Sequence, residues 1–420
     1  KIDLLNAFVF LIISAIAILL FFYSYHSIKK EINEKKQTAF YAALLLIYAG
    51  LVGIVLTGDV FNAFVFLEIS SLSSYAAISM GQDKRALNSA FQYLIMGTLG
   101  ATFFLIGIGF LYAMTGTLNM SDLAQRLPEV RDTTTVRTGA AFIFVGIALK
   151  LAMFPLHLWL PNAYAFSPSV VSIFLAATST KVAIYLLMRM LFTVFGVELT
   201  FKEMHLEYLL LPLAALAILS TSLVAIFQTN LKRMMGYSSV AQIGYMLMGI
   251  GMMNISGTTA TLIHIFNHAL MKGALFMALG AVFFRIGSVN LKNLAGIGHF
   301  MPWTMGVILI GTMSLIGFPL TAGFVSKWFL ISSALEAGFW WIVPIIILGS
   351  LLAAIYTWRI INVLWLKKTI KSNIEIKEAP LSLLMPALLL ALANIYFGIN
   401  TDIPISNAEN IAIFLSGMIK

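Results

Sequence analysis

The sequence contains no cysteine and very little charge. Without cysteine, the chain cannot hold a disulfide, a thiolate metal site or an iron–sulfur cluster, so any redox chemistry must lie on a partner. Charged residues make up 10% of the 420 residues and hydrophobic residues 60%, whereas soluble domains have about 25% charged residues. A soluble core could not hide so much apolar surface. The composition therefore indicates a membrane protein.

The sequence also lacks a hydrophilic linker that would separate domains. Its formal net charge is +9, but the basic residues are scattered over short loops between apolar runs. This pattern is typical of loops that face anionic lipid rather than nucleic acid. We therefore expect a single polytopic membrane domain over 1–420, with the lipid bilayer and not nucleic acid as its surroundings.

Apolar runs of membrane-spanning length recur along the chain. A helix needs about 20 apolar residues to cross ~30 Å of hydrocarbon, and helices satisfy their own backbone in lipid. The first run is too long for a cleavable signal peptide and lacks its small-residue ending, so we expect a true span there. The predicted fold class is all-α integral membrane with about twelve transmembrane helices. The predicted spans are 4–25, 38–57, 60–80, 86–114, 139–166, 169–192, 206–227, 234–253, 258–284, 303–335, 339–366 and 381–396.

Basic residues favour one side of the predicted membrane, and such a bias marks the cytoplasmic loops. The loops after the odd-numbered spans contain Lys29, Lys30, Lys35, Lys36, Lys84, Arg85, Lys232, Arg233, Arg285, Lys292, Lys367, Lys368, Lys371 and Lys377. The opposite side contains the smaller set Lys1, Arg126, Arg131, Arg137, Lys202 and Lys420. The bias predicts a multi-pass protein with both termini outside.

Proline interrupts two of the predicted spans near their centres. The tripeptide FPL occurs at 154–156 and again at 318–320, which is 164 residues later (318 − 154 = 164). Paired broken helices in the two halves of a transporter indicate binding sites near the midplane. Proline kinks can also be purely architectural. A lysine accompanies each break, which favours the functional interpretation.

Charged residues are rare inside the predicted spans. Glu68 is the one acid well inside a span, where a carboxylate is costly unless it is paired or protonated. Lys150, Lys181 and Lys327 lie inside later spans, and burial disfavours the charged form of a lysine enough to permit proton exchange near neutral pH. The alternatives are a structural ion pair for Glu68 and static counter-ions or lipid phosphate contacts for the lysines.

Histidines line one face of the predicted span 258–284. His264, His268 and Lys272 follow one another at intervals of four residues, which places them on the same helix face. Histidine titrates near neutrality and can relay protons through water. A pair of histidines can also pack in a core or bind a metal, but no Glu separates these two as a zinc motif would require. His157 at the first break is a possible further member of the relay.

The remaining polar residues give no sign of catalysis. Arg189 and Arg359 lie within reach of helix ends and are expected to extend to the interface. The sequence contains neither a nucleophile elbow nor a phosphate-binding P-loop. We therefore predict no catalytic residue, no metal and no cofactor site on this chain.

Longer motifs surround the buried charges. They read FNAFVFLE at 61–68, KLAMFPLHLWLP at 150–161, GYSSVAQIG at 236–244, HIFNHALMK at 264–272 and GFPL at 317–320. With these motifs, the sequence resembles the antiporter-like membrane subunits shared by respiratory complex I, Mrp-type sodium/proton antiporters and membrane-bound NiFe hydrogenases. The resemblance covers nearly the whole chain.

The resemblance implies an architecture with internal symmetry. Two five-helix repeats, about 38–192 and about 206–366, would be related by an inverted pseudo-symmetry, and each would contain one Pro-broken helix. Members of the family usually have fourteen helices. A count of twelve would fit a chain that lacks the first two.

The resemblance also implies a path for protons. Glu68 would pair with Lys150, Lys181 would link this pair to the two histidines, and Lys327 would end the route. The predicted path residues are Glu68, Lys150, Lys181, His264, His268 and Lys327, with His157 and Lys272 as possible additions.

The implied function is that of a proton-translocating subunit of a redox-driven complex in a prokaryotic cell membrane, with sodium as the alternative ion. The expected partners are other membrane subunits, a peripheral redox arm and the transported protons or sodium ions. Iron–sulfur clusters and a NiFe centre or flavin would lie on partner subunits. The alternatives are a stand-alone secondary transporter, such as a cation/proton antiporter, and a structural subunit that does not pump.

Overall fold

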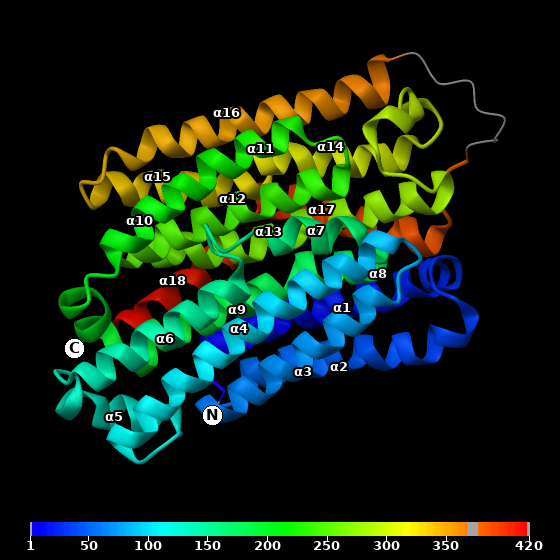
Figure 1. The fold of residues 1–420 in the computed structure, drawn as a ribbon. Helices are drawn as coiled ribbons and strands as arrows, with labels where there is room; N and C mark the ends of the chain where they lie inside the picture. The colour runs from blue at the N-terminus through cyan, green and yellow to red at the C-terminus, as the bar shows by residue number, and fades with distance from the viewer. Residues whose placement is uncertain (1, 368–376, 418–420) are drawn as a thin grey trace.

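The computed structural model describes residues 2–367 and 377–417, which form one bundle of long helices (Figure 1). Four residues of the predicted charge bias, Lys1, Lys368, Lys371 and Lys420, lie outside the described residues. The helices are α1 (Leu4–Glu31), α2 (Gln37–Leu56), α3 (Val60–Ser79), α4 (Lys84–Thr115), α5 (Met120–Val130), α6 (Thr134–Leu151), α7 (Trp159–Phe166), α8 (Ser169–Phe174), α9 (Thr180–Met188), α10 (Glu207–Leu216), α11 (Ser222–Phe227), α12 (Leu231–Gly251), α13 (Ile255–Ile286), α14 (Pro302–Ile316), α15 (Ala322–Glu336), α16 (Ile342–Ile361), α17 (Leu381–Ile399) and α18 (Asp402–Gly417).

All twelve predicted spans correspond to helical segments, so the prediction of an all-α membrane fold is confirmed. Ten helices in the described part of the chain are long and apolar enough to cross a membrane. The span in α12 is not among the ten because glycine, serine and glutamine lower its hydropathy, and neighbouring helices bury it almost completely. The tenth predicted span is divided into α14 and α15, each of which is short.

Both predicted breaks are present, and each follows a helix that ends in a left-handed residue. The residue after α6 is Ala152 with φ 57°, and the residue after α14 is Gly317 with φ 87°. Proline lacks a backbone N–H and clashes with the preceding turn, so Pro155 and Pro319 disfavour continuation of the helix at both places. The breaks leave helix-terminal carbonyls without partners inside their own helices.

The same local structure occurs twice along the chain at a constant offset. Isolated antiparallel bridges join Asp59 to Asn119 and Asn230 to Asn290, each across 60 residues (119 − 59 = 290 − 230 = 60). The second bridge follows the first by 171 residues (230 − 59 = 171). Helices α4 and α13 are both 32 residues long and start 171 residues apart (255 − 84 = 171). Corresponding parts of the two halves therefore have the same length and the same ends.

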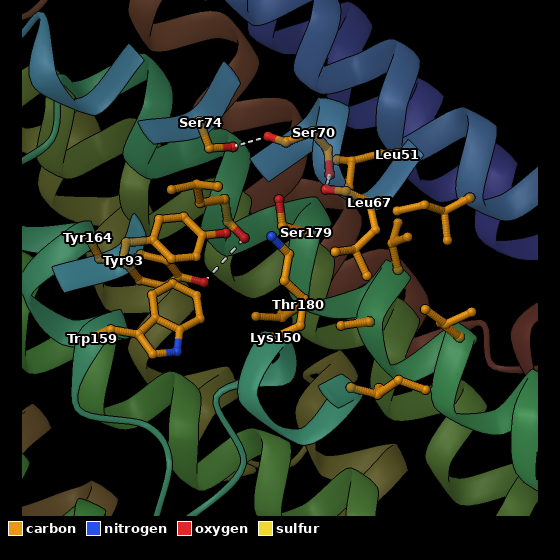
Figure 2. A pocket seen from close by; sticks show the side chains of 16 residues that line it. Leu51, Leu67, Ser70, Ser74, Tyr93, Lys150, Trp159, Tyr164, Ser179 and Thr180 are labelled. Carbon is orange, nitrogen blue, oxygen red and sulfur yellow. Dashed lines mark hydrogen bonds between the residues drawn. The ribbon is translucent and has the colours of Figure 1, made fainter. Parts of the chain in front are cut away.

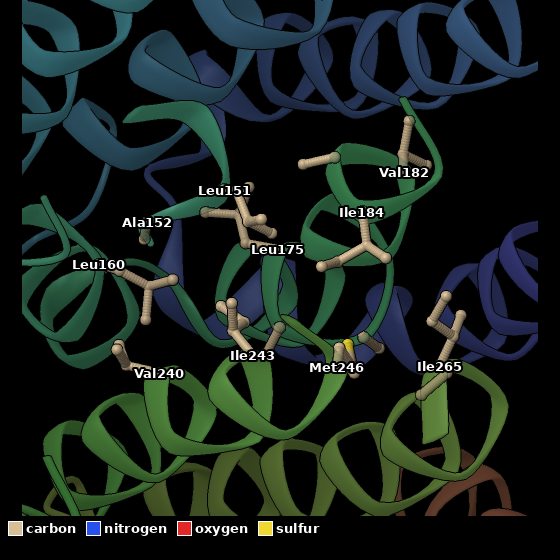
Figure 3. Close-up of a cluster of buried hydrophobic side chains, with 14 of the residues drawn as sticks. Leu151, Ala152, Leu160, Leu175, Val182, Ile184, Val240, Ile243, Met246 and Ile265 are labelled. Atoms are coloured by element: carbon tan, nitrogen blue, oxygen red, sulfur yellow. The ribbon is translucent and has the colours of Figure 1, made fainter. Parts of the chain in front are cut away.

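The centre of the bundle contains three strongly buried helices. In the continuous helix Ser169–Val194, which includes α8 and α9, 94% of the residues in the most apolar stretch are buried, and in α13 78% of them are. Helix α12 is buried almost throughout. Apolar side chains of α6, α9, α12 and α13 meet there, among them Leu151, Ile184, Ile243 and Ile265 (Figure 3). The helices that contain Lys181 and the two path histidines are thus, with α12, strongly shielded from lipid.

Arg189 and Arg359 each bind groups at the end of another helix, and their extension to the membrane interface stays a prediction. Arg189 is 6% exposed and forms two hydrogen bonds with Asp3, at 2.7 and 2.9 Å. Arg359 donates to the carbonyls of Ile226 and Gln228 at the end of α11. Burial raises the pKa of Asp3, but the hydrogen bonds and charge of Arg189 outweigh it and leave this pKa below the usual aspartate value. Both arginines therefore hold the ends of other helices in place.

Candidate functional site

The first buried pair lies between α3 and α6. Lys150 donates a hydrogen bond to the Ser71 hydroxyl, and its ammonium lies 5.1 Å from the ring centre of Tyr93 and 5.9 Å from that of Tyr75. Glu68 is partly buried, and its Oε1 has no hydrogen-bond partner among the described residues. The two charges interact electrostatically but form no ion pair in the described part of the chain. Lys150 is therefore held away from Glu68.

The aromatic surroundings of Lys150 are themselves fixed. Tyr93 stacks on Trp159 with ring centres 4.0 Å apart and planes 2° from parallel. The indole of Trp159 donates to the Leu149 carbonyl at 3.1 Å. Because α7 starts at Trp159, directly after the first break, the broken helix positions the ring against which Lys150 rests.

A small cavity lies between Lys150 and the residues just before Lys181 (Figure 2). Its volume is about 20 Å³, enough for about one water molecule. Hydroxyl groups of Tyr164, Ser179 and Thr180 line it together with Lys150. Thr180 Oγ1 in turn accepts a hydrogen bond of 3.3 Å from Lys181 Nζ. Polar groups thus connect the two lysines through α9.

Lys181 lies at a widened turn of its helix. Residues Leu175–Ser179 are π-helical, and such wide turns often mark functional sites. Lys181 is 0% exposed and donates to the Ala176 carbonyl at 2.5 Å. A backbone carbonyl therefore solvates the ammonium in the protein interior.

The two histidines on one face of α13 lie in the middle of the candidate path. The rings of His264 and His268 are nearly parallel, with centres 6.1 Å apart. His264 Nδ1 lies 2.8 Å from Ser326 Oγ, whereas His264 Nε2 and both nitrogens of His268 are buried without partners in the described residues. Buried polar atoms are nearly always hydrogen-bonded, so these nitrogens are suited to accept water or a transferred proton.

The last two lysines lie beyond the histidines. Lys327 donates to the carbonyls of Leu315 and Ile316 at 2.8 and 3.0 Å and to Ser350 Oγ at 2.8 Å. The two carbonyls belong to the end of α14, so the second break supplies the ligands of this lysine. Lys272 donates to the Met235 carbonyl and to Ser238 Oγ, at 2.9 and 3.1 Å. Each ammonium is again bound by neutral oxygens.

The structure connects some candidates directly and leaves others apart. Tyr245 joins two of them, since its ring lies 4.8 Å from Lys327 Nζ and 5.8 Å from the His264 ring. His157 packs against Phe154 and Tyr237, and in the described chain no hydrogen bond or ring contact joins it to a predicted path residue. In the same residues, no three His, Asp or Glu side chains gather to hold a metal.

The sequence did not single out the neutral partners of the path. These are hydroxyl and aromatic residues, and such residues are common in membrane helices. The sequence indicates such a partner only where a hydroxyl residue directly precedes a buried lysine, as Thr180 precedes Lys181. The partners are Ser71, Tyr75, Tyr93, Tyr164, Tyr245, Ser326 and Ser350.

Comparison with known proteins relates the chain to two kinds of membrane subunit. The family described as NADH:quinone oxidoreductase/Mrp antiporter, transmembrane, matches residues 57–353. An NADH-quinone oxidoreductase subunit of Desulforudis audaxviator is 41% identical over 393 residues, 91% of this chain and 78% of that protein. A Na(+)/H(+) antiporter subunit of Alkalihalophilus pseudofirmus is 32% identical over 332 residues, 79% of this chain and 66% of that protein.

Solved structures share the fold along the whole chain. A chain of the membrane-bound sulfane sulfur reductase, an archaeal respiratory membrane complex, superposes with a TM-score of 0.89 at 30% identity, over 99% of this chain and 84% of that one. A chain of the Mrp complex from Dietzia sp. superposes with a TM-score of 0.88 at 23% identity. The superposition covers 100% of this chain and 86% of that one. The second likeness concerns the fold alone.

Proposed function

The chain belongs to the NADH:quinone oxidoreductase/Mrp antiporter family of membrane subunits, and we propose that it translocates protons along its buried Glu/Lys/His path. The observation that carries this proposal is a series of neutrally solvated charges in the interior of the bundle. The small cavity and Thr180 connect Lys150 to Lys181, Lys181 interacts electrostatically with His268, and the ring of Tyr245 lies between His264 and Lys327.

We propose that the distance between Glu68 and Lys150 controls proton loading. A unit charge pair at 4 Å is worth about 4 kcal/mol at an effective dielectric of 20. One pKa unit corresponds to about 1.4 kcal/mol. A movement of Lys150 from the Ser71 and tyrosine contacts towards Glu68 would therefore favour its charged form, and the reverse movement would favour proton release.

We also propose how the path is placed within the subunit, the complex and the membrane. The equal offsets of the two bridges and of α4 and α13 support two repeats, which we place at about 38–192 and about 206–366. We propose, from the family resemblance, that the two repeats are inverted relative to each other. A peripheral redox arm with iron–sulfur clusters and a flavin or NiFe centre would drive the cycle. The subunit would lie in a prokaryotic cell membrane with both termini outside.

Variants of the first pair test the proposal. Glu68→Gln and Lys150→Ala, in the purified complex reconstituted in vesicles, should each lower proton flux at least tenfold because the loading step loses one charge. Lys202→Ala is the matched control, since Lys202 is exposed. Wild-type flux in both path variants would refute proton translocation here and favour a structural subunit. Replacement of sodium by choline should leave the flux unchanged, and loss of flux would indicate sodium instead.

A further inference from the structure

A large polar cavity lies where the ends of α1, α4, α7, α12 and α13 meet. Its volume is about 680 Å³, within the range of about 300–1,000 Å³ that is typical of ligand pockets. Its walls include the loops after α3, α11 and α13, which the charge bias predicts to be cytoplasmic. None of the proposed path residues lines it. The cavity therefore needs an explanation separate from proton transfer.

The acids of the cavity already have partners. Asp83 forms an ion pair with Arg85 at 2.7 Å. Glu31 is 8% exposed, and its two oxygens accept hydrogen bonds from the Ser27 hydroxyl at 2.7 Å and from the Ser169 backbone N–H at 2.8 Å. Neither carboxylate has an oxygen left without a donor in this structure.

The cations of the cavity are in excess and have free donors. Lys30, Arg85, Lys232 and Arg233 face two acids, which leaves an excess of two positive charges (4 − 2 = 2). Lys232 is 3% exposed and donates to the Ser169 hydroxyl at 3.1 Å.

Arg233 is the cation with the fewest contacts. Its Nε is buried without a hydrogen-bond partner among the described residues, and its guanidinium lies 5.9 Å from the ring centre of Tyr237. A buried donor without a partner is unfavourable, whereas the rest of Arg233 is partly exposed. An anion that enters the cavity could therefore reach the guanidinium and supply its missing partner.

We propose that this cavity binds a phosphate group, from the head group of an anionic phospholipid or from soluble phosphate. The planar guanidinium of Arg233 can donate two parallel hydrogen bonds to phosphate oxygens. Lys30 and Lys232 supply the remaining charge at the rim and at the floor. Basic pockets between membrane helices on the cytoplasmic side are suited to lipid head groups.

Native mass spectrometry of the purified full chain tests the site. The chain is extracted from vesicles that contain phosphatidylglycerol and phosphatidylcholine in equal amounts. The wild type should retain phosphatidylglycerol and release phosphatidylcholine. Arg233→Gln and Lys30→Gln should each lower this retention about tenfold, because each loses a charged hydrogen-bond donor. Lys292→Gln is the matched control, as an exposed lysine of the same face outside this cavity.

Competition identifies the source of the phosphate. Displacement of the lipid by millimolar inorganic phosphate supports a soluble ligand, and retention of the lipid supports a phospholipid. Equal phosphatidylglycerol retention in the wild type and both variants would overturn the proposal, as would equal retention of the two lipids. Lys30 is exposed, so its variant remains informative if Arg233→Gln fails to fold. Since no transport is measured, this result is independent of the proposed function.

Discussion

The lysines of the path share one kind of surroundings. Lys181, Lys272 and Lys327 each donate to backbone carbonyls, and Lys150 donates to a hydroxyl. A hydrogen bond from a charged group to a neutral oxygen contributes about 1.5–3 kcal/mol net, whereas an ion pair at 4 Å is worth about 4 kcal/mol at a dielectric of 20. A proton or an ammonium therefore leaves such a site more easily than it would leave a carboxylate. This makes the sites suitable as transient stations.

The ring of Tyr93 offers a test of the first station. Tyr93→Leu removes the ring 5.1 Å from Lys150 Nζ, and cation–π contacts contribute about 0.5–2 kcal/mol. Proton flux in vesicles should fall by a factor of about 2 to 30, whereas Tyr93→Phe keeps the ring and its stack on Trp159 and should pump nearly as the wild type. Equal flux in the two variants would show that the ring has no role in holding Lys150.

Sequence alone located the charged residues of the site but not their neutral partners. Glu68 and Lys181 stand out because charge is rare in apolar helices. Ser71 and Tyr245 do not stand out, since similar residues occur throughout the spans. Only the packing of distant segments selects them: Ser71 lies 79 residues from Lys150, and Ser326 lies 62 residues from His264.

Among the helical elements, the broken helices have a direct chemical role. An intact helix binds nearly all of its carbonyls internally, whereas a break leaves the last ones free. At the second break, the carbonyls of Leu315 and Ile316 are bound by Lys327 from α15. The proline that ends the helix thereby creates a cation site within the membrane. This link between break and lysine is the physical reason to expect function at the repeated FPL motif.

The close approach of α14 and α15 depends on a glycine. A Cβ at Gly323 would lie 1.9 Å from the Ser314 carbonyl oxygen, so Gly323→Ala must push the two half-helices apart and weaken the Lys327 site. We expect a lower melting temperature and at least a tenfold loss of flux.

The matched control is Gly306→Ala in α14. A Cβ at that position has no neighbour within 4 Å, and alanine favours a helix by about 1 kcal/mol over glycine. This variant should melt at the wild-type temperature or above it and should pump normally. Unchanged melting and flux in Gly323→Ala would contradict the role given to the close approach.

Elements were predictable where they leave a strong local signal. Long apolar runs and the two prolines placed the spans and both breaks. Helix α5 was missed because it is short and amphipathic, and α18 because its 16 residues include Asp402 and Glu409. The π-helical turn at Leu175–Ser179 was also missed, since one extra residue per turn leaves no periodic pattern over five positions.

At the scale of the whole molecule, the repeated elements indicate how the chain is built, and the distribution of basic residues indicates how it is oriented in the membrane. The two bridges and the equal lengths of α4 and α13 indicate a repeated construction. The basic residues break this equivalence, since they gather at one end of the bundle, where they also form the cavity around Arg233. Orientation in the membrane therefore follows from charge and not from the repeat.

The absence of cysteine allows this orientation to be measured without background. Lys84 is exposed at the start of α4, and Lys202 is exposed after α9 at the opposite end of the bundle. Basic loops stay in the cytoplasm. In intact cells, a membrane-impermeant maleimide should therefore label Lys202→Cys and leave Lys84→Cys unlabelled, and permeabilised cells should show both. The reverse pattern would place the termini inside. It would also place the Arg233 cavity outside, where anionic lipid is scarcer and a head-group ligand would be correspondingly harder to supply.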